Sequence, residues 1–270
     1  MKKIIITSLL FLLFVFSLFG CTANNKKNDK VELVVFAAAS MTETMNEIAE
    51  NYMEEHKGIR IVFNFDSSGT LKTQIQEGAE CDAFLSAGQK QMNALDVNHN
   101  DKGNDYLASN TRFNLLENKI ALVVPENNPK QIISFDQLAN SIKGQDIFLS
   151  IGSGDVPVGD YALQVLSYYG LDDKKLAKNG KITYGSNAKE ITTQISESVV
   201  DAGIIYTTDA MSADLEIVDI ATDDMCSRAI YPVALIKNSK KSEEGKDFLD
   251  YLKSEDAKKI FESVGFTVIK

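Results

Sequence analysis

The sequence predicts an α/β protein with two lobes, each a mainly parallel sheet flanked by helices. Short apolar strands alternate with amphipathic helices from Val31 onward, and a second alternating series begins at Lys119. A late strand after Tyr231, beyond the second series, suggests that the chain crosses back to the first lobe. We expect a ligand-binding cleft between the lobes, because ligands of open α/β sheets bind beyond the carboxyl ends of the strands.

A processing signal precedes this fold. Two lysines are followed by an apolar run, Ile4 to Phe19, which is short for a membrane crossing of about 20 residues. Leu18-Phe19-Gly20-Cys21 resembles the lipobox of bacterial lipoproteins, in which the cysteine carries the lipid. We therefore expect a signal peptide at residues 1–20 and a lipid-anchored polar tether at residues 21–30. A plain membrane anchor is the alternative, and both place the body outside the cytoplasm.

The body that follows is long enough for two lobes. About 240 residues remain, and two lobes of roughly 120 residues each can bury a core at that size. We expect residues 31–117 with residues 231–270 to form lobe I, and residues 118–230 to form lobe II.

The first lobe should begin with a βαβαβ unit. Its expected elements are a strand at 31–37, a helix from Met41, a strand at 59–65, a helix from Thr70 and a strand at 83–86. The apolar residues of the first helix recur at helical spacing and should face the core: Met45, Ile48, Ala49, Tyr52 and Met53.

The second lobe should repeat the alternation before the chain returns. Its expected elements are strands at 119–124, 147–151, 182–184 and 202–206 and helices at 135–140, 158–169 and 187–199. The returning part should contain a strand at 233–236 and helices at 242–252 and 254–263.

The net charge and the positions of cysteine and histidine argue against some classes of function. Loss of the signal peptide removes two lysines and changes the formal net charge from −10 to −12, which argues against nucleic-acid binding. An anion site must then rest on local donors, because the protein's overall field repels anions. Cys81 and Cys226 remain, either as free thiols or as a disulfide. His56 and His99 lie at no metal-ligand spacing, so we expect no directly coordinated metal.

Three strand-to-helix junctions are rich in small and hydroxyl residues. They are Ala37-Ala38-Ala39-Ser40, Asp66-Ser67-Ser68-Gly69-Thr70 and residues 152–159. Each leads into a helix, whose first N–H groups lack internal partners and favour anions. Ser40 with Glu43, and Ser68 by itself, are equally consistent with helix caps.

Six segments, in this order along the chain, resemble the periplasmic molybdate-binding proteins. They are Val35-Phe36-Ala37-Ala38-Ala39-Ser40, Phe65-Asp66-Ser67-Ser68-Gly69-Thr70-Leu71, Asp82-Ala83-Phe84-Leu85-Ser86-Ala87, Val156-Pro157-Val158-Gly159-Asp160-Tyr161-Ala162, Gly203-Ile204-Ile205-Tyr206 and Tyr231-Pro232-Val233. The resemblance covers nearly the whole body. It implies a two-lobed periplasmic-binding-protein type II fold with the ligand in the cleft between the lobes.

The resemblance also implies an oxyanion site made of hydroxyls and backbone amides, without charged side chains. Carried over by position, it implies hydroxyl donors at Ser40, Ser68 and Tyr206 and backbone N–H donors at Val158 and Ala188. Val158 replaces a commoner alanine and Ala188 a commoner valine, and both changes keep the backbone donor. From the residues alone, Tyr206 also fits a polar tip that closes a buried strand.

The implied function is solute binding, without catalysis and without a cofactor. The ligand would be molybdate or tungstate, delivered to the permease of an ABC importer by a monomer anchored through Cys21 at the outer face of the cytoplasmic membrane. A fully deprotonated tetrahedral dianion accepts hydrogen bonds only, whereas monohydrogen phosphate needs an acceptor for its proton. We expect Asp66 and Asp155, next to the junctions, to point away. A receptor for sulfate or another oxyanion, or less favourably an enzyme on the same scaffold, is the alternative.

Overall fold

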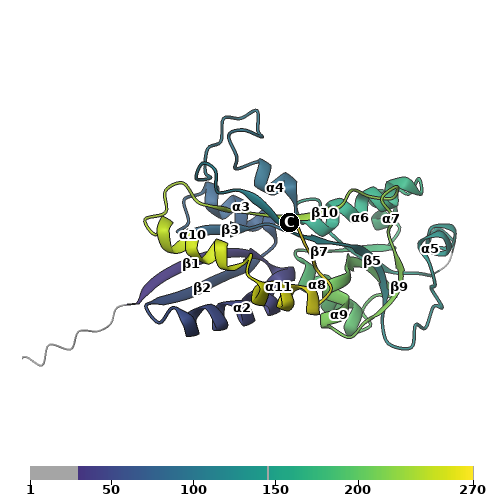
Figure 1. Ribbon diagram of the computed structural model, residues 1–270. Coiled ribbons are helices and arrows are strands. Elements are labelled where there is room, and N and C mark those ends of the chain that lie inside the picture. Colours follow the sequence, from purple (N-terminus) through teal and green to yellow (C-terminus); the bar gives the residue numbers. More distant parts are fainter. Residues whose placement is uncertain (1–29, 145, 270) are drawn as a thin grey trace, which may run out of the picture. The chain divides into compact units, whose positions relative to one another are not determined.

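Two β-sheets with flanking helices make up the fold (Figure 1). The first sheet has six strands in the order β11-β4-β10-β3-β1-β2, and the second has five in the order β7-β6-β8-β5-β9. The first sheet contains β1 (Val31–Ala38), β2 (Ile59–Asp66), β3 (Ala83–Leu85), β4 (Phe113–Asn118), β10 (Ala229–Leu235) and β11 (Thr267–Val268). The second contains β5 (Ile120–Val124), β6 (Leu149–Gly152), β7 (Ile182–Gly185), β8 (Ala202–Tyr206) and β9 (Glu216–Ile220).

Both sheets are mixed, whereas the sequence predicted mainly parallel ones. β1 pairs in parallel with β2 and β3, and β6 with β7 and β8. The antiparallel pairs involve β4, β5 and β10. These strands lie where the chain passes from one sheet to the other, so they do not enter through the helical crossover that makes neighbouring strands parallel. The two-lobed α/β class is confirmed, and the strand directions are corrected.

Helices accompany both sheets. Those that follow strands of the first sheet are the 3-10 helix η2 (Ala39–Met41), α2 (Thr42–Glu55), α3 (Ser68–Gln76), α4 (Gln89–Asn93), α10 (Ser242–Tyr251) and α11 (Glu255–Ser263). Those that follow strands of the second are α5 (Phe135–Ser141), α6 (Pro157–Tyr168), α7 (Asp173–Lys178), α8 (Ala188–Ser196) and α9 (Thr207–Ser212). The apolar stripe predicted for α2 is confirmed, because four of its residues are buried and Met53 packs against the core.

The chain crosses between the sheets twice. It leaves the first sheet at Asn118 and enters the second at Ile120, and it returns between Ile220 and Ala229. Val31–Lys270 form one compact unit. The exact lobe boundaries therefore stay a prediction.

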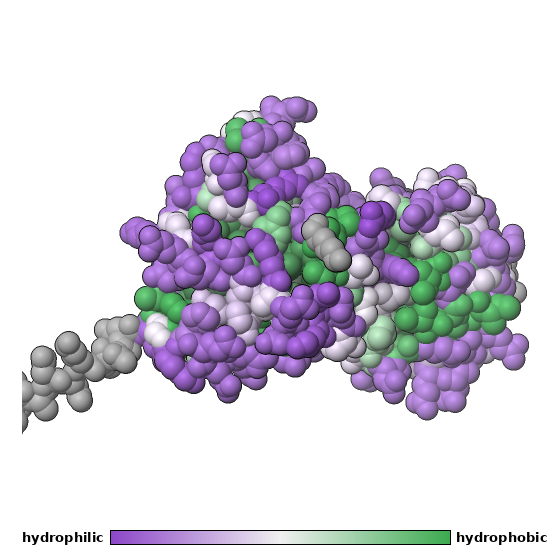
Figure 2. Space-filling model, viewed as in Figure 1, coloured by the Kyte–Doolittle hydropathy of each residue, from purple (hydrophilic) through white to green (hydrophobic). Residues whose placement is uncertain are grey.

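The structure, a computed structural model, describes residues 30–144 and 146–269. The predicted signal peptide, the lipobox with Cys21 and nearly all of the tether lie outside them. Within the described residues, no helix combines the length and the apolar character that a membrane crossing requires. Hydrophilic residues cover most of the face in Figure 2, and hydrophobic surface gathers near β9 and α5, where Ile220 and Ile133 are exposed.

Candidate functional site

A narrow cavity with a volume of about 10 Å³ brings together every site residue that the resemblance implies. Elements associated with the first sheet contribute Ser40 and Ser68. Elements of the second contribute Val158, Ala188 and Tyr206. All five are at least 90 % buried, so residues separated by up to 166 positions line one small cavity.

Ser40 lies in η2, immediately before α2, and does not cap that helix. The N-cap residue of α2 is Met41, and no side chain caps it. The Ser40 Oγ instead lies 3.1 Å from the hydroxyl oxygen of Tyr231 in β10. The capping-box interpretation of Ser40 and Glu43 is therefore wrong, and the Ser40 hydroxyl is available to the cavity.

Ser68 is also free of a capping role, because its neighbour performs it. The Oγ of Ser67 accepts the N–H of Thr70 at 3.1 Å and so caps α3. The Oγ of Ser68 accepts the backbone N–H of Ala87 at 2.9 Å, which ties α3 to the segment after β3. A hydroxyl that accepts from an N–H still has its own proton to donate.

The two backbone donors lie at helix N-termini. Val158 is the second residue of α6, whose N-cap residue Val156 supplies no side-chain hydrogen bond. Ala188 is the first residue of α8, and the side chain of its N-cap residue Asn187 accepts from the Glu190 N–H at 2.9 Å. First-turn N–H groups have no partner inside their own helix, and they carry the positive end of the helix dipole.

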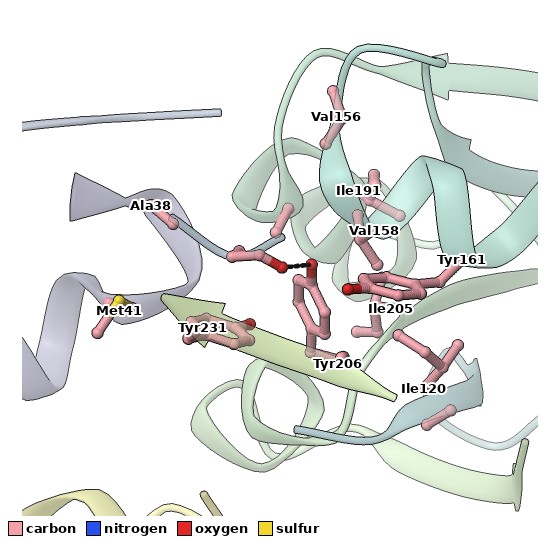
Figure 3. Close-up of a cluster of buried hydrophobic side chains, with 14 of the residues drawn as sticks. Ala38, Met41, Ile120, Val156, Val158, Tyr161, Ile191, Ile205, Tyr206 and Tyr231 are labelled. Atoms are coloured by element: carbon pink, nitrogen blue, oxygen red, sulfur yellow. Dashed lines mark hydrogen bonds between the residues drawn. The ribbon is translucent and has the colours of Figure 1, made fainter. Parts of the chain in front are cut away.

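Tyr206 ends β8 and reaches from the second sheet to the first. Its hydroxyl donates to the carbonyl oxygen of Ala87 at 3.1 Å (Figure 3). Its ring lies between those of Tyr231 and Tyr161, with ring centroids 5.5 and 6.3 Å away. Burial raises the pKa of Tyr206 well above its usual value, so the hydroxyl stays protonated and can donate.

The acidic residues near the junctions differ in position. Asp155 is exposed and is not part of the cavity lining. Asp66 does line the cavity, contrary to expectation. Its Oδ1 is occupied, because it accepts the Ser67 N–H at 2.6 Å.

A charged group behind the cavity was not predicted from the sequence. Asp209 in α9 is fully buried, and neither of its carboxylate oxygens has a hydrogen-bond partner among the described residues. Burial raises its pKa to about 7, partly offset by the Lys189 ammonium 3.7 Å away. Lys189 also pairs with Glu43 of α2 at 2.8 Å, so this ion pair joins α8, beside the second sheet, to α2, beside the first.

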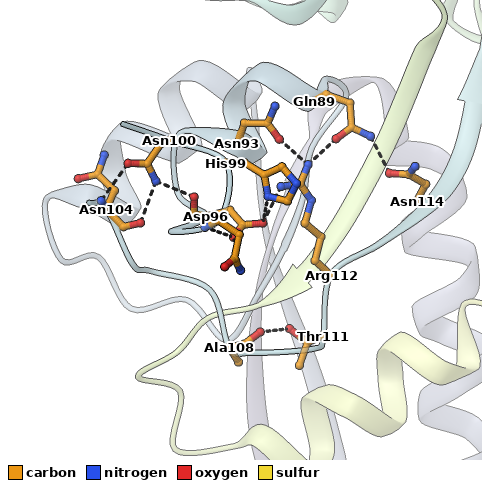
Figure 4. Close-up of polar contacts among 11 residues, drawn as sticks. Gln89, Asn93, Asp96, His99, Asn100, Asn104, Ala108, Thr111, Arg112 and Asn114 are labelled. Atoms are coloured by element: carbon orange, nitrogen blue, oxygen red, sulfur yellow. Dashed lines mark hydrogen bonds and ion pairs between the residues drawn. The ribbon is translucent and has the colours of Figure 1, made fainter. Parts of the chain in front are cut away.

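A polar cluster holds α4 beside the site (Figure 4). Arg112 donates to Asp96 at 2.7 Å and to the side-chain oxygens of Asn93 and Gln89 at 2.5 Å. Burial alone would raise the pKa of Asp96, but the hydrogen bonds from Arg112 and its neighbours hold it below the usual value. The helix so fixed carries Lys90, which pairs with Asp160 of α6 at 2.9 Å.

The two cysteines of the body, Cys81 and Cys226, do not line this cavity. Cys81 and Cys226 are both buried and unpaired, so the free-thiol alternative is the observed one. Burial raises the pKa of Cys81 to about 12. The part of the chain that the structure describes contains no cluster of three or more His, Cys, Asp or Glu residues that could hold a metal ion.

Sequence reasoning missed the residues behind the cavity wall. Tyr231 appears in one of the six matched segments, but nothing there assigns it a role. Asn118, Lys189 and Asp209 carry no local signal, because their relation to the cavity depends on contacts between distant elements.

Comparison with known proteins agrees with this geometry. Residues 33–267 match the family model described as bacterial extracellular solute-binding protein. YvgL of Bacillus subtilis (strain 168), provisionally named an ABC transporter substrate-binding lipoprotein, is 37% identical over 253 residues, which cover 92% of each chain. The molybdate-binding protein ModA of Escherichia coli (strain K12) is 32% identical over 252 residues, which cover 91% of this chain and 93% of that protein.

A solved structure supports the fold. The periplasmic molybdate-binding protein of Azotobacter vinelandii aligns with a TM-score of 0.75 at 20% identity, covering 88% of this chain and all of that one. The resemblance recognised in the sequence is therefore confirmed. Because the family match spans most of the chain, and its relatives are solute-binding proteins and not enzymes, the chain belongs to the bacterial extracellular solute-binding protein family.

Proposed function

We propose that the protein captures molybdate or tungstate outside the cytoplasmic membrane and delivers it to the permease of an ABC importer. The main support for this proposal is the cavity that is lined by Ser40, Ser68, Val158, Ala188 and Tyr206. These residues would contribute three hydroxyls and two helix-terminal N–H groups. The names of the molybdate-binding relatives point to the same ligand class. We further propose a monomer held to the membrane by lipid on Cys21, with lobes at the predicted boundaries.

The donor set suits a fully deprotonated oxyanion. Molybdate and tungstate offer only acceptors, and each proposed contact offers a proton. Burial strengthens such hydrogen bonds because little water competes for them. The donors are neutral, which fits a protein whose overall charge repels anions and which must bind one by local contacts.

Ligand entry would require the two lobes to separate. A cavity of about 10 Å³ has room for roughly one water molecule, and a tetrahedral oxyanion is larger. On opening, the hydrogen bond from Tyr206 to Ala87 and the ion pair between Lys189 and Glu43 would break. On closure around the ligand, the Tyr206 hydroxyl would donate its one proton to the ligand instead of to Ala87. A permease that recognises only the closed, ligand-bound form distinguishes loaded from empty protein.

Calorimetric titration tests the ligand and the site together. Residues 22–270 would be titrated with molybdate, tungstate, sulfate and phosphate, with a Ser40→Ala/Ser68→Ala double variant alongside. Each lost hydrogen bond to a charged ligand costs about 1.5 to 3 kcal/mol, so we expect the double variant to lose at least about a hundredfold in affinity. Ser150→Ala is the control, because Ser150 is a buried serine that does not line the cavity.

The outcomes separate the alternatives. Tight one-to-one binding of molybdate or tungstate with weak sulfate binding would support the proposal. Preference for sulfate would indicate a sulfate receptor, which the same donors also suit. No heat with any oxyanion, for folded and ligand-free protein, would contradict the proposed ligand class.

Membrane anchoring has its own test. Cys21→Ala should release the protein from the membrane fraction of the producing bacterium, because the lipid would have no attachment site. Retention of this variant in the membrane would favour the plain membrane anchor instead.

A further inference from the structure

Tyr231 stands directly behind Ser40 and is completely buried. Its hydroxyl oxygen lies 3.1 Å from the Ser40 Oγ, and either atom is chemically able to donate. The direction of this hydrogen bond decides what Ser40 presents to the cavity. If Tyr231 donates, Ser40 has its proton left for a ligand; if Ser40 donates, only lone pairs remain.

Asn118, at the end of β4, settles the direction. Its side-chain Oδ1 lies 2.9 Å from the backbone N of Lys119, and it accepts the Thr207 hydroxyl at 3.0 Å. A backbone N–H can only donate, so the oxygen of the Asn118 amide must face it. The Nδ2 group therefore faces the other way, 3.1 Å from the hydroxyl oxygen of Tyr231 and 2.8 Å from that of Thr208.

The phenol then has one place for its proton. The Asn118 Nδ2 can only donate, so the Tyr231 oxygen accepts from it. Among the described residues, Asn118 and Ser40 lie within hydrogen-bond distance of this hydroxyl. Burial raises the pKa of Tyr231 well above its usual value, so the proton stays on the phenol. Tyr231 consequently donates to Ser40.

Ser68 is oriented by the same rule. Its Oγ accepts from the Ala87 N–H, a group that never accepts, so its own proton remains free. Both serines of the cavity thus have an oxygen lone pair occupied from behind. The side turned to a ligand is the O–H.

We propose that Tyr231, oriented by Asn118, is a positioning residue that directs the proton of Ser40 toward the ligand and so disfavours protonated oxyanions at the site. This inference rests on the proposed oxyanion function and names the residues that give the site its selectivity. At Ser40, a sulfate or molybdate dianion meets a proton. Monohydrogen phosphate brings a proton of its own, and Ser40, with Tyr231 donating to one of its lone pairs, turns its O–H and not a lone pair toward that proton.

Tyr231→Phe removes the hydroxyl that donates to Ser40 and keeps the aromatic ring. The ring packs on those of Tyr206 and Phe266, with centroids 5.5 and 5.2 Å away, and phenylalanine preserves both contacts. Without the phenol proton, Ser40 can rotate and accept. Sulfate and monohydrogen phosphate are the probes, since they are similar in size and differ by one proton. Their affinities are measured by displacement of molybdate at about pH 8.

We expect the preference for sulfate over phosphate to fall by about tenfold in Tyr231→Phe. A merely structural role would weaken both anions alike and leave the ratio unchanged. Tyr161→Phe is the matched control, because Tyr161 is a neighbouring buried tyrosine that does not line the cavity, and its ratio should equal that of the wild type.

Asn118→Asp is a second, independent variant, which should reverse the hydrogen bond between Tyr231 and Ser40. An aspartate cannot donate to Tyr231, so the phenol proton would turn to the carboxylate and Ser40 would have to donate to Tyr231. This variant should lose molybdate affinity as well as selectivity. The inference is overturned if folded Tyr231→Phe and Asn118→Asp both keep the wild-type sulfate-to-phosphate ratio. If the wild type binds no oxyanion at all, the proposed function itself fails, which is a distinct result.

Discussion

Gly69 in α3 packs against the backbone of Asp155, in the loop before α6, with no room for a side chain between them. A Cβ on Gly69 would overlap the Asp155 carbonyl oxygen and lie 3.0 Å from the carbonyl carbon. The two residues belong to elements that accompany different sheets. Their contact lies beside the cavity, since Ser68 and Val156 both line it.

Gly69→Ala should hold the lobes apart without removing a ligand donor. Alanine suits a helix better than glycine by about 0.5 to 1 kcal/mol, so the fold should persist. We expect molybdate affinity to fall at least about tenfold, because the methyl group opposes closure. Calorimetry measures the loss. Gly154→Ala is the control, because a Cβ there meets no atom within 4 Å; equal affinities of the two variants would contradict the closure model.

The ion pairs between helices of the first sheet and helices of the second should strengthen ligand binding modestly, because they favour the closed form. Glu43 pairs with Lys189, and Lys90 with Asp160, but at least one partner of each pair is more than half exposed. Exposed pairs contribute about 0.2 to 1 kcal/mol, so Glu43→Gln should lower molybdate affinity by no more than about fivefold. The effect should shrink in high salt. Asp250→Asn, which breaks the exposed pair between Asp250 of α10 and Lys253 just after that helix, should leave the affinity unchanged.

Asp209 should make stability fall as pH rises. The pKa of Asp209 is about 7 in the folded protein against an ordinary value of 3.8, so the folded state binds the extra proton between those values. The contribution of Asp209 to the free energy of unfolding is fully present below about pH 4. It decreases by at most about 1.4 kcal/mol per pH unit until about pH 7. The groups whose charges reach this carboxyl are Lys189, Glu43, Tyr206 and Tyr231.

Asp209→Asn tests this dependence, because asparagine keeps the shape and cannot ionise. Urea unfolding would be measured near pH 5 and near pH 8. We expect the variant to gain stability relative to the wild type at the higher pH. Parallel pH profiles for the two proteins would show that Asp209 does not titrate in this range.

Arg112 should be among the most stabilising charged residues. Its partner Asp96 is 91% buried at the side chain, and removing one member of a buried pair costs about 3 to 5 kcal/mol. Arg112→Met should therefore lower the free energy of unfolding by about 3 kcal/mol, and adding Asp96→Asn should restore part of it. Because the pKa of Asp96 is depressed in the folded state, its stabilisation should disappear as the pH falls below about 4.

The two buried thiols should react slowly. Burial raises the pKa of Cys81 to about 12 and that of Cys226 to about 11, which leaves very little thiolate at neutral pH. A thiol reagent should modify both residues rapidly in urea and slowly without it. Intact mass of unreduced protein should correspond to two free thiols, and a mass two hydrogens lower would indicate a disulfide.

The spacing of apolar residues along the sequence was sufficient to predict most of the helices and strands. β8 at Ala202–Tyr206 is observed where the sequence predicts it, and α6 and α10 begin or end within a residue of expectation. Their apolar residues repeat with the period of a strand or helix, and this signal lies within one segment. By contrast, β9 is an edge strand that is exposed or half-buried throughout, so its residues lack the alternation that marks a strand. The short helices α4, α7 and α9 offer too few turns for a helical period to be recognised.

The sequence by itself determined the α/β class, the core stripe of α2 and, through ordered family motifs, the five residues that meet at the cavity. Only the tertiary structure decided that Ser67 caps α3 while Ser68 faces the cavity, since both serines suit either role locally. It also placed Tyr231 behind Ser40, 191 residues away in the chain. Hydrogen-bond direction depends on which donors and acceptors distant strands bring together, and no local pattern of residues encodes that arrangement.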